Sequence, residues 1–483
     1  MPSNVVVRVK ASSPALQEGL EAIEKELDLP GDFPPDVVAE AEQAAADVVL
    51  PDLDRTDLEL ITIDPDGSMD LDQALHIERA GDDGAGYVVH YAIADVAAFV
   101  EPGGPIDLEA HRRGETLYGA GSRIPLHPPE LSEGAASLLP DQACPALLWT
   151  LEVDAEGSLT KTHVERAKVR SRGRWSYVDA QAALDRGDAP EVLTLLKEVG
   201  ALRQQQERDR GGISLPLPEQ EIDETDAGFE LTFREQLPVE EWNAQISLMT
   251  GIAAAALMVE AKIGLLRTLP PADPRDVKRL RRVAHGLRID WPKDMDYPDF
   301  VRSLDPAKSQ HQAMVVACTR LLRGSGYAAF DGELPEQRLH SAIAAEYAHV
   351  TAPLRRLGDR YTGEVCVAVC AGEPVPDWVR SALPDLPKTL QTSGQRAGSY
   401  ERAVLSLLEA LVLADGGSSV GREYDGVVTE VRDDDERSGE VILADIGVEA
   451  PITADRPLPL GEEVKARLDS VDVAARKVAF VLA

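Results

Sequence analysis

The segment from Leu60 to Leu75 constrains the fold more than any other part of the chain, because it joins two apolar strand-like runs through a tight acidic turn. The turn carries four carboxylates: Asp64, Asp66, Asp70 and Asp72. The apolar runs require burial, whereas carboxylates this close repel one another unless water or cations compensate their charge. Hard divalent cations bind through oxygen ligands, so the segment predicts a metal-binding strand–turn–strand. An ordinary solvated acidic turn is the alternative that the segment alone leaves open.

A calcium loop of the EF-hand type does not fit this turn. Counted from Asp64, the loop would need glycine where Met69 stands and glutamate where Leu75 stands. In phosphoryl chemistry, a pair of metal ions about 3.5–4 Å apart can activate a water molecule and stabilise the leaving oxygen. Several carboxylates that converge from one turn can support that arrangement.

Net charge alone argues against a nucleic-acid partner, because the 483 residues carry a formal charge of −35. Local charge decides binding, however, and two stretches run against the average. Residues 165–174 hold five basic groups against one acidic group, and residues 265–288 hold seven against two. They are either a basic strand edge and a solvated helix face, or the surfaces that hold a polyanion.

The four cysteines, Cys144, Cys318, Cys366 and Cys370, are too few and too scattered for a disulfide framework or a zinc site. The N-terminus lacks the apolar core of a signal peptide, and the apolar stretch 251–259 is too short to span a bilayer. We therefore expect a soluble, cytoplasmic protein without a membrane partner.

The pattern of apolar residues predicts an α+β fold rather than a doubly wound sheet. Residues 1–50 form a short helical appendage, with a strand at 5–9 and helices at 14–27 and 36–47. Residues 51–415 form a large mixed domain. Its expected strands are 58–63, 87–93 and 147–153, and its expected helices are 239–262, 310–322 and 400–413.

The C-terminal region, residues 422–483, follows a hinge at Gly416-Gly417-Ser418-Ser419. Five short strands are expected there, at 426–431, 440–445, 450–452, 463–471 and 477–481. Five strands in a region of this size predict a small barrel of the OB type.

Four ordered motifs resemble the ribonuclease II family with its RNB-type catalytic domain. Asp64, Asp70 and Asp72 match the spacing of the family's active-site aspartates, but Gln73 stands where the family has a fourth aspartate. The other three motifs are 91–100, then Tyr118 with 124–132 and 137–140, and finally 347–359. In the last motif the family usually has serine at Ala352 and often tyrosine at Leu357. The likeness covers about residues 35–483 and implies a member without N-terminal cold-shock barrels.

The resemblance implies roles for individual residues. Asp64, Asp70 and Asp72 would hold Mg²⁺, with Mn²⁺ as the alternative, and Asp66 or Gln73 are further candidate ligands. Arg355 would contact the scissile phosphate. The implied RNA-binding residues are Tyr118, Tyr177, Glu241, Glu401 and Arg356. The C-terminal barrel would be an RNA-binding domain of the ribosomal S1 type, with Tyr424 as its candidate aromatic surface.

The family likeness implies a 3′-to-5′ exoribonuclease that degrades single-stranded RNA processively to nucleoside 5′-monophosphates. A catalytically impaired, RNA-binding member of the same fold is the main alternative, because Gln73 replaces an expected ligand. An unrelated metal-dependent phosphatase would explain the aspartates but would leave Tyr118 and the barrel without a role.

Overall fold

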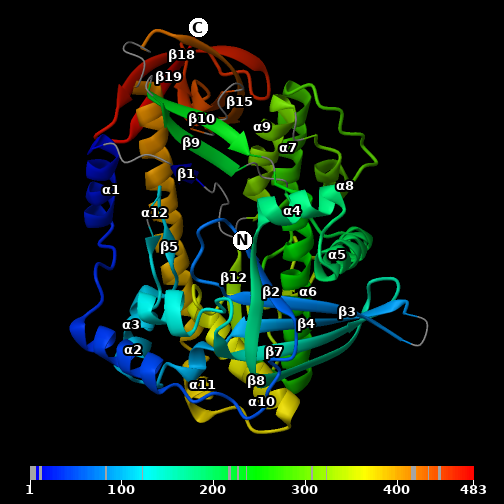
Figure 1. The fold of residues 1–483 in the computed structure, drawn as a ribbon. Coiled ribbons are helices and arrows are strands. Elements are labelled where there is room, and N and C mark those ends of the chain that lie inside the picture. The colour runs from blue at the N-terminus through cyan, green and yellow to red at the C-terminus, as the bar shows by residue number, and fades with distance from the viewer. Residues whose placement is uncertain are drawn as a thin grey trace.

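The structure of the protein is a computed structural model. It describes residues 7–9, 14–81, 84–121, 123–215, 219–225, 228–234, 236–305, 308–322, 324–414, 420–432, 434–443 and 448–483. The hinge expected at 416–419 lies outside these described residues. Figure 1 shows a large helix-and-strand body with a separate group of strands at its C-terminal end, as expected for an α+β protein.

A closed barrel of five strands forms the centre of the large body. The strands are β2 (Leu60–Asp64), β3 (Gln73–Ala80), β4 (Gly86–Ala94), β7 (Ala143–Val153) and β8 (Leu159–Ser176). Neighbouring strands are antiparallel except β2 and β8, whose parallel pairing closes the barrel. The expected strands at 58–63, 87–93 and 147–153 are confirmed as β2, β4 and β7. The closure and the long β8 were not predicted, because basic residues interrupt the apolar positions of β8.

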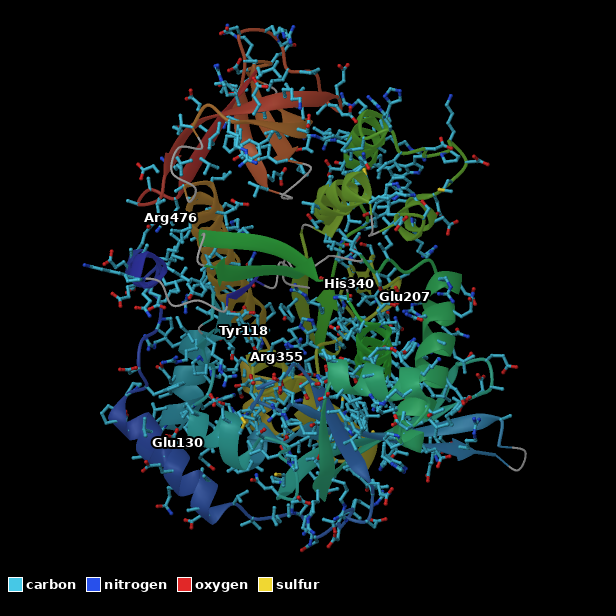
Figure 2. The ribbon with its side chains drawn as sticks, turned by 45° about the horizontal axis from the view of Figure 1, so that its top comes forward. Tyr118, Glu130, Glu207, His340, Arg355 and Arg476 are labelled. Atoms are coloured by element: carbon cyan, nitrogen blue, oxygen red, sulfur yellow. The ribbon has the colours of Figure 1, made fainter. Side chains whose placement is uncertain are left out.

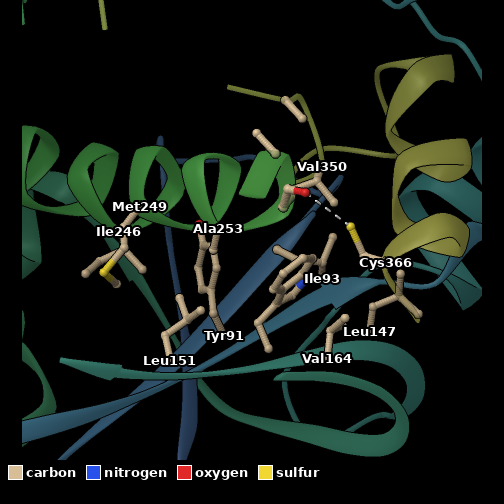
Figure 3. Close-up of a cluster of buried hydrophobic side chains, with 14 of the residues drawn as sticks. Tyr91, Ile93, Leu147, Leu151, Val164, Ile246, Met249, Ala253, Val350 and Cys366 are labelled. Carbon is tan, nitrogen blue, oxygen red and sulfur yellow. Dashed lines mark hydrogen bonds between the residues drawn. The ribbon is translucent and has the colours of Figure 1, made fainter. Parts of the chain in front are cut away.

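The main hydrophobic core lies between this barrel and two helices, α6 (Pro238–Ala261) and α10 (Leu357–Ala371). Figure 3 shows Tyr91 and Leu151 of the barrel directed toward Ala253 and Met249 of α6. Among the described helices, α6 is long and apolar enough to cross a membrane, but half of its most apolar window is buried inside the fold. Its packing is that of a core helix.

The two described helices of the N-terminal region pack against the large body. Helix α1 (Pro14–Glu26) lies along α12 (Leu386–Ala414), and α2 (Pro35–Asp47) lies against α3 (Pro105–Arg113). Both expected helices are thus confirmed. The expected helix at 400–413 is the second half of α12, whose first half is rich in glycine, serine and threonine and therefore has weak helical propensity.

The remaining elements surround the barrel. The helices are α4 (Tyr177–Arg186), α5 (Glu191–Asp209), α7 (Pro274–Gly286), α8 (Tyr297–Arg302), α9 (Ser309–Cys318), α11 (Asp377–Ala382) and the short turns η1 (Val96–Ala98), η2 (Leu131–Ala135) and η3 (Thr319–Leu322). The strands are β1 (Val7–Val9), β9 (Glu219–Thr225), β10 (Gly228–Arg234), β5 (Leu117–Tyr118), β6 (Arg123–Ile124), β11 (Ile263–Thr268), β12 (Gly326–Asp331), β13 (Leu339–His340) and β14 (Ala345–Glu346).

The C-terminal region is a second closed barrel, as predicted. Its five strands are β15 (Glu423–Val431), β16 (Ser438–Leu443), β17 (Glu449–Thr453), β18 (Glu463–Asp472) and β19 (Lys477–Leu482). Tyr424 does not form an exposed aromatic surface. Its side chain is 8% exposed and packs edge-on against Phe480 inside the barrel, so Tyr424 is a core residue.

The C-terminal barrel is docked on α7. A Cβ atom added to Gly286 would lie 0.8 Å from the carbonyl oxygen of Gly461, so the two backbones are in direct contact and leave no room for a side chain. Two ion pairs flank this contact, Arg279 with Glu430 at 2.9 Å and Arg288 with Glu463 at 2.9 Å. Figure 1 shows the C-terminal strands lying over the ends of α7 and α12.

Candidate active site

The acidic turn connects β2 to β3 at one end of the first barrel. Because these strands are antiparallel, the C-terminal end of β2 with Asp64 and the N-terminal end of β3 after Asp72 lie at the same edge. The turn itself is closed by a hydrogen bond from the Ser68 amide to the Pro65 carbonyl, and Gly67 adopts φ +80°. Asp64, Asp70 and Asp72 are therefore presented from one short segment.

Asp72 is buried against the segment that precedes α10. Its Oδ1 accepts a hydrogen bond from the Leu354 amide at 2.8 Å, and its Oδ2 lies 3.4 Å from Nε of Arg355. Burial raises the pKa of Asp72 to about 7, although the charge of Arg355 opposes the shift. Arg355 is 44% exposed, so its guanidinium has room to meet a ligand.

Asp64 carries a negative charge that the protein compensates only in part. Its buried Oδ2 accepts no hydrogen bond from any residue that the structure describes. Burial raises its pKa to about 6; Arg355 and Arg174 lower it and Asp70 raises it. Buried polar atoms in folded proteins are normally paired. The unpaired oxygen of Asp64 therefore fits the position of an atom that binds a cation.

Asp70 faces the other side of the turn. Nη1 of Arg123 donates to its Oδ1 at 2.6 Å, and Nη2 of the same guanidinium lies 2.5 Å from Glu133. The family motifs did not single out Arg123 or Glu133. Neither has a distinctive local pattern in the sequence, and only the fold brings them to the turn.

Gln73 and Asp66 are the two uncertain candidates for a further ligand. The Gln73 amide donates to the Thr351 carbonyl at 2.7 Å, and its oxygen accepts from the Tyr91 hydroxyl at 2.5 Å. Asp66 is exposed at the tip of the turn. The structure therefore places Gln73 in a hydrogen-bond network with Thr351 and Tyr91, and Asp66 in solvent.

The two tyrosines lie on either side of the carboxylates. Tyr118 is 45% exposed, and its hydroxyl lies within the electrostatic range of Arg355, Asp70 and Asp72. Figure 2 shows Tyr118 and Arg355 next to each other near the middle of the molecule. Tyr177 begins α4; Asn243 of α6, which the sequence motifs did not indicate, donates to its hydroxyl at 3.5 Å. Burial raises the pKa of Tyr177, and the nearby charge of Asp64 adds to this shift.

The two glutamates lie apart from the carboxylate turn. Glu241 is exposed and accepts a hydrogen bond from Gln204 at 2.8 Å, whereas its neighbour Glu240 acts electrostatically on Tyr177. Glu401 lies on α12, where its charge acts on the partly buried Glu115.

Arg356 forms a double hydrogen bond with Asp359, with Nη2 and Oδ2 2.6 Å apart. The structure therefore shows Arg356 supporting the segment that carries Arg355. It is 24% exposed, so part of its side chain still faces solvent.

The donor set of the turn suits a hard divalent cation. Asp64, Asp70 and Asp72 offer carboxylate oxygens, which hard divalent cations prefer as ligands. The unpaired Oδ2 of Asp64 is available to coordinate such a cation. Within the described ranges, no three His, Cys, Asp or Glu side chains are already grouped with metal-ligand geometry. The reason is visible at two positions, because Asp70 is turned toward Arg123 and Asp72 toward Arg355.

Most of the basic residues of 265–288 have partners inside the protein. Arg279 and Arg288 pair with the C-terminal barrel, and Arg275 pairs with Asp273. Arg281 donates to the carbonyls of Trp291, Pro292 and Met295. On β8, Arg166 pairs with Asp95 and Glu364, and Lys168 pairs with Asp54. Arg174 remains exposed beside Asp64.

Comparison with known proteins gives two family matches. Residues 53–369 match the RNB domain, and residues 422–483 match the RNase II-type exonuclease C-terminal S1 domain. An uncharacterized ribonuclease of Synechocystis is 25% identical over 88% of this chain and 59% of its own length. Ribonuclease R of Escherichia coli is 29% identical over 64% of this chain and 39% of its own length. The chain thus spans less than two thirds of these relatives.

Solved structures show the same fold. The apo form of Mycoplasma genitalium RNase R aligns with a TM-score of 0.83 and 19% identity, over 97% of this chain and 78% of that one. Yeast Ssd1, described as a pseudonuclease, aligns with a TM-score of 0.70 and 15% identity, over 96% of this chain and 58% of that one. Because the RNB domain match covers most of the chain, the protein belongs to the RNB family, with a C-terminal S1 domain of the RNase II type.

Proposed function

We propose that this protein is a divalent-metal-dependent 3′-to-5′ exoribonuclease that releases nucleoside 5′-monophosphates processively from single-stranded RNA. The observation that carries the proposal is the incomplete compensation of Asp64 and Asp72, two buried carboxylates beside the half-exposed Arg355. Ribonuclease R and other RNB-domain relatives support the reaction class.

Asp64, Asp70 and Asp72 would hold the cation, which we propose is Mg²⁺ with Mn²⁺ as the alternative. When bound, such a cation lowers the pKa of its water and stabilises charge on phosphate oxygens. The chain itself supplies Arg355, whose exposed guanidinium can donate two hydrogen bonds to the scissile phosphate as negative charge develops there.

The aromatic residues would hold the RNA without reading its sequence. Tyr118 offers a partly exposed ring beside Arg355, and stacking on such a ring tolerates any base. Tyr177 lies on the Asp64 side and would contact the 3′ nucleotide, with Glu241, Glu401 and Arg356 as the remaining proposed contacts. The charges of Glu401 and Arg356 both act on Glu115, so these two residues lie in one neighbourhood. Glu241 instead accepts a hydrogen bond from Gln204, so its proposed contact with RNA has the least structural support of the three.

A catalytically impaired RNA-binding protein is the second candidate. The specific observation in its favour is that Gln73, held by Thr351 and Tyr91, adds no negative charge to the turn where the family has an aspartate. The pseudonuclease Ssd1 has the same fold.

The domain division at residues 50 and 415–422 and the cytoplasmic location remain predictions of the sequence.

Incubation with single-stranded RNA labelled throughout its length and Mg²⁺ tests the proposal against this second candidate. We expect loss of the full-length band to nucleoside 5′-monophosphates and one short end product, without a ladder of intermediates. RNA of the same sequence with a 3′-terminal phosphate is the matched substrate control and is expected to react more slowly. RNA that is bound but never shortened at any metal concentration would support the impaired protein instead.

A further inference from the structure

Arg123 occupies a position that the proposed reaction does not explain. It stands on β6, directly opposite Tyr118 of β5, so the two residues are cross-strand neighbours in one two-stranded hairpin. Its guanidinium contacts two carboxylates that belong to separate segments. Nη1 donates to Asp70 of the acidic turn at 2.6 Å, and Nη2 lies 2.5 Å from Glu133 of η2. The planar guanidinium presents its donors in a fixed fork, so two such contacts fix its orientation.

The two carboxylates belong to a rigid support. The Ser137 hydroxyl donates to the Met69 carbonyl at 2.6 Å and accepts from the Leu71 amide at 2.9 Å. These two bonds flank Asp70 on the turn and tie the turn to the segment that follows Glu133. Asp70 and Glu133 are 16% and 30% exposed at the side chain, so their contacts with Arg123 are partly shielded from water.

The hairpin is anchored on the face opposite Tyr118, where Leu117 and Ala120 are buried in a hydrophobic core with α1 and α12. Its base is bound to the Arg355 segment through the Thr116 amide and the Arg355 carbonyl, which are 3.0 Å apart. Each strand of the hairpin contains two residues, so the ladder contributes little rigidity of its own. On the Tyr118 face, the double contact of Arg123 ties the hairpin to the acidic turn and holds the guanidinium close enough for its charge to act on the Tyr118 hydroxyl.

We propose that Arg123 and Glu133 are positioning residues that fix the ring of Tyr118 relative to the carboxylate turn and so set how tightly the last nucleotides are held. The proposal rests on the proposed function, because it assigns Tyr118 to stacking on RNA. Without Glu133, only Asp70 would hold the guanidinium next to Tyr118, and the exposed ring would sample more orientations although the hairpin backbone stays anchored. A ring with a variable orientation stacks less well, because ordering it on binding costs conformational entropy.

A double-mutant cycle between Glu133 and Tyr118 tests this coupling. The binding of a single-stranded RNA of about six nucleotides, a length within the range of small binding sites, is measured in EDTA so that no cleavage occurs. The proteins are wild type, Glu133→Gln, Tyr118→Ala and the double variant. Glu130→Gln is the matched control, because Glu130 is exposed, lies just before η2 and undergoes the same change of charge (Figure 2).

We expect Glu133→Gln to weaken binding about threefold to tenfold in wild type and less than about twofold in the Tyr118→Ala background, because coupled residues are not additive. Glu130→Gln should match wild type, and melting temperatures of all variants show whether each is folded. An equal effect of Glu133→Gln in both backgrounds would overturn the coupling while leaving the role of Tyr118 intact. No effect of Tyr118→Ala itself would instead remove the stacking role on which both proposals depend.

Discussion

The acidic turn and helix α7 both concentrate charge of one sign, and the fold treats the two charges in opposite ways. On α7 and directly after it, Arg275, Arg279 and Arg288 are paired with carboxylates at 2.7–2.9 Å, and the last two pairs hold the C-terminal barrel. In the turn, Asp64 keeps an oxygen without a described partner, and burial raises the pKa of Asp64 to about 6 and that of Asp72 to about 7. Charge compensated within the chain stabilises the architecture, whereas the charge left uncompensated lies in the turn that we propose to be the reactive site.

The substitution Asp72→Asn should have the largest effect, because it changes the acidic turn and leaves the contacts of α7 intact. We expect cleavage of single-stranded RNA to fall roughly 1000-fold or more, the upper range for loss of one preorganised electrostatic group. RNA affinity should change little, because an asparagine oxygen can still accept from the Leu354 amide and the phosphate contacts lie elsewhere. Single-turnover cleavage and filter binding of the same RNA check this. Cleavage at the wild-type rate would remove Asp72 from the site.

Tyr118→Ala should alter the end of the reaction more than its beginning. Stacking of one base on an aromatic ring contributes about 1–3 kcal/mol, so short products should dissociate about tenfold faster. The smallest product should then become longer, while the initial rate on long RNA falls less. Gel analysis of the final products gives the readout. An unchanged product distribution would mean that the exposed Tyr118 ring has no contact with RNA.

Gly286→Ala should disturb the barrel without touching the acidic turn. The new methyl group would overlap the Gly461 carbonyl, and relieving such overpacking costs about 1–3 kcal/mol. We expect the affinity for long RNA to fall about fivefold to tenfold, with little change in the cleavage of short oligonucleotides. Gly31→Ala is the matched control, because nothing lies within 4 Å of its added Cβ. Equal losses on long and short RNA would contradict a separate role for the docked barrel.

The smallest expected effect concerns Glu409 of α12, which faces Glu449 and Glu440 of the C-terminal barrel. Burial, and then the charges of these two glutamates, raise the pKa of Glu409 to about 8. A carboxyl whose pKa is raised on folding stabilises the fold fully below its unfolded pKa and loses that contribution as the pH rises through about 8. We expect the melting temperature to fall by a few degrees as the pH rises from the ordinary glutamate pKa of 4.5 to about 8, and to change little from this cause at higher pH. The fall should be smaller in Glu409→Gln, and an identical pH profile would show that Glu409 does not titrate in this range.

The sequence was most informative where function and fold depend on consecutive residues. The spacing of Asp64, Asp70 and Asp72 identified the turn, and alternating apolar residues identified all five strands of the C-terminal barrel. The closure of the first barrel was not visible, because it requires the parallel pairing of β2 with β8, about a hundred residues apart.

Long-range pairing also explains the residues that the sequence did not identify. Arg123 meets Asp70 and Glu133 only through the hairpin, and Arg279 and Arg288 find their glutamates in a different barrel. An arginine that pairs within the protein and an arginine that binds RNA have the same local sequence signature. The basic stretch 265–288 was therefore ambiguous until its contacts were known.

The central claim is that the carboxylate turn is a divalent-metal site that cleaves RNA, and a metal titration on wild-type protein tests it most directly. A single-stranded RNA labelled throughout its length is incubated with increasing Mg²⁺ or with EDTA, and cleavage and binding are measured on the same samples. The account predicts that Mg²⁺ converts full-length RNA to nucleoside 5′-monophosphates and a short end product, and that EDTA stops cleavage while binding persists. Binding without cleavage at every Mg²⁺ and Mn²⁺ concentration, or cleavage that EDTA leaves unchanged, would contradict it.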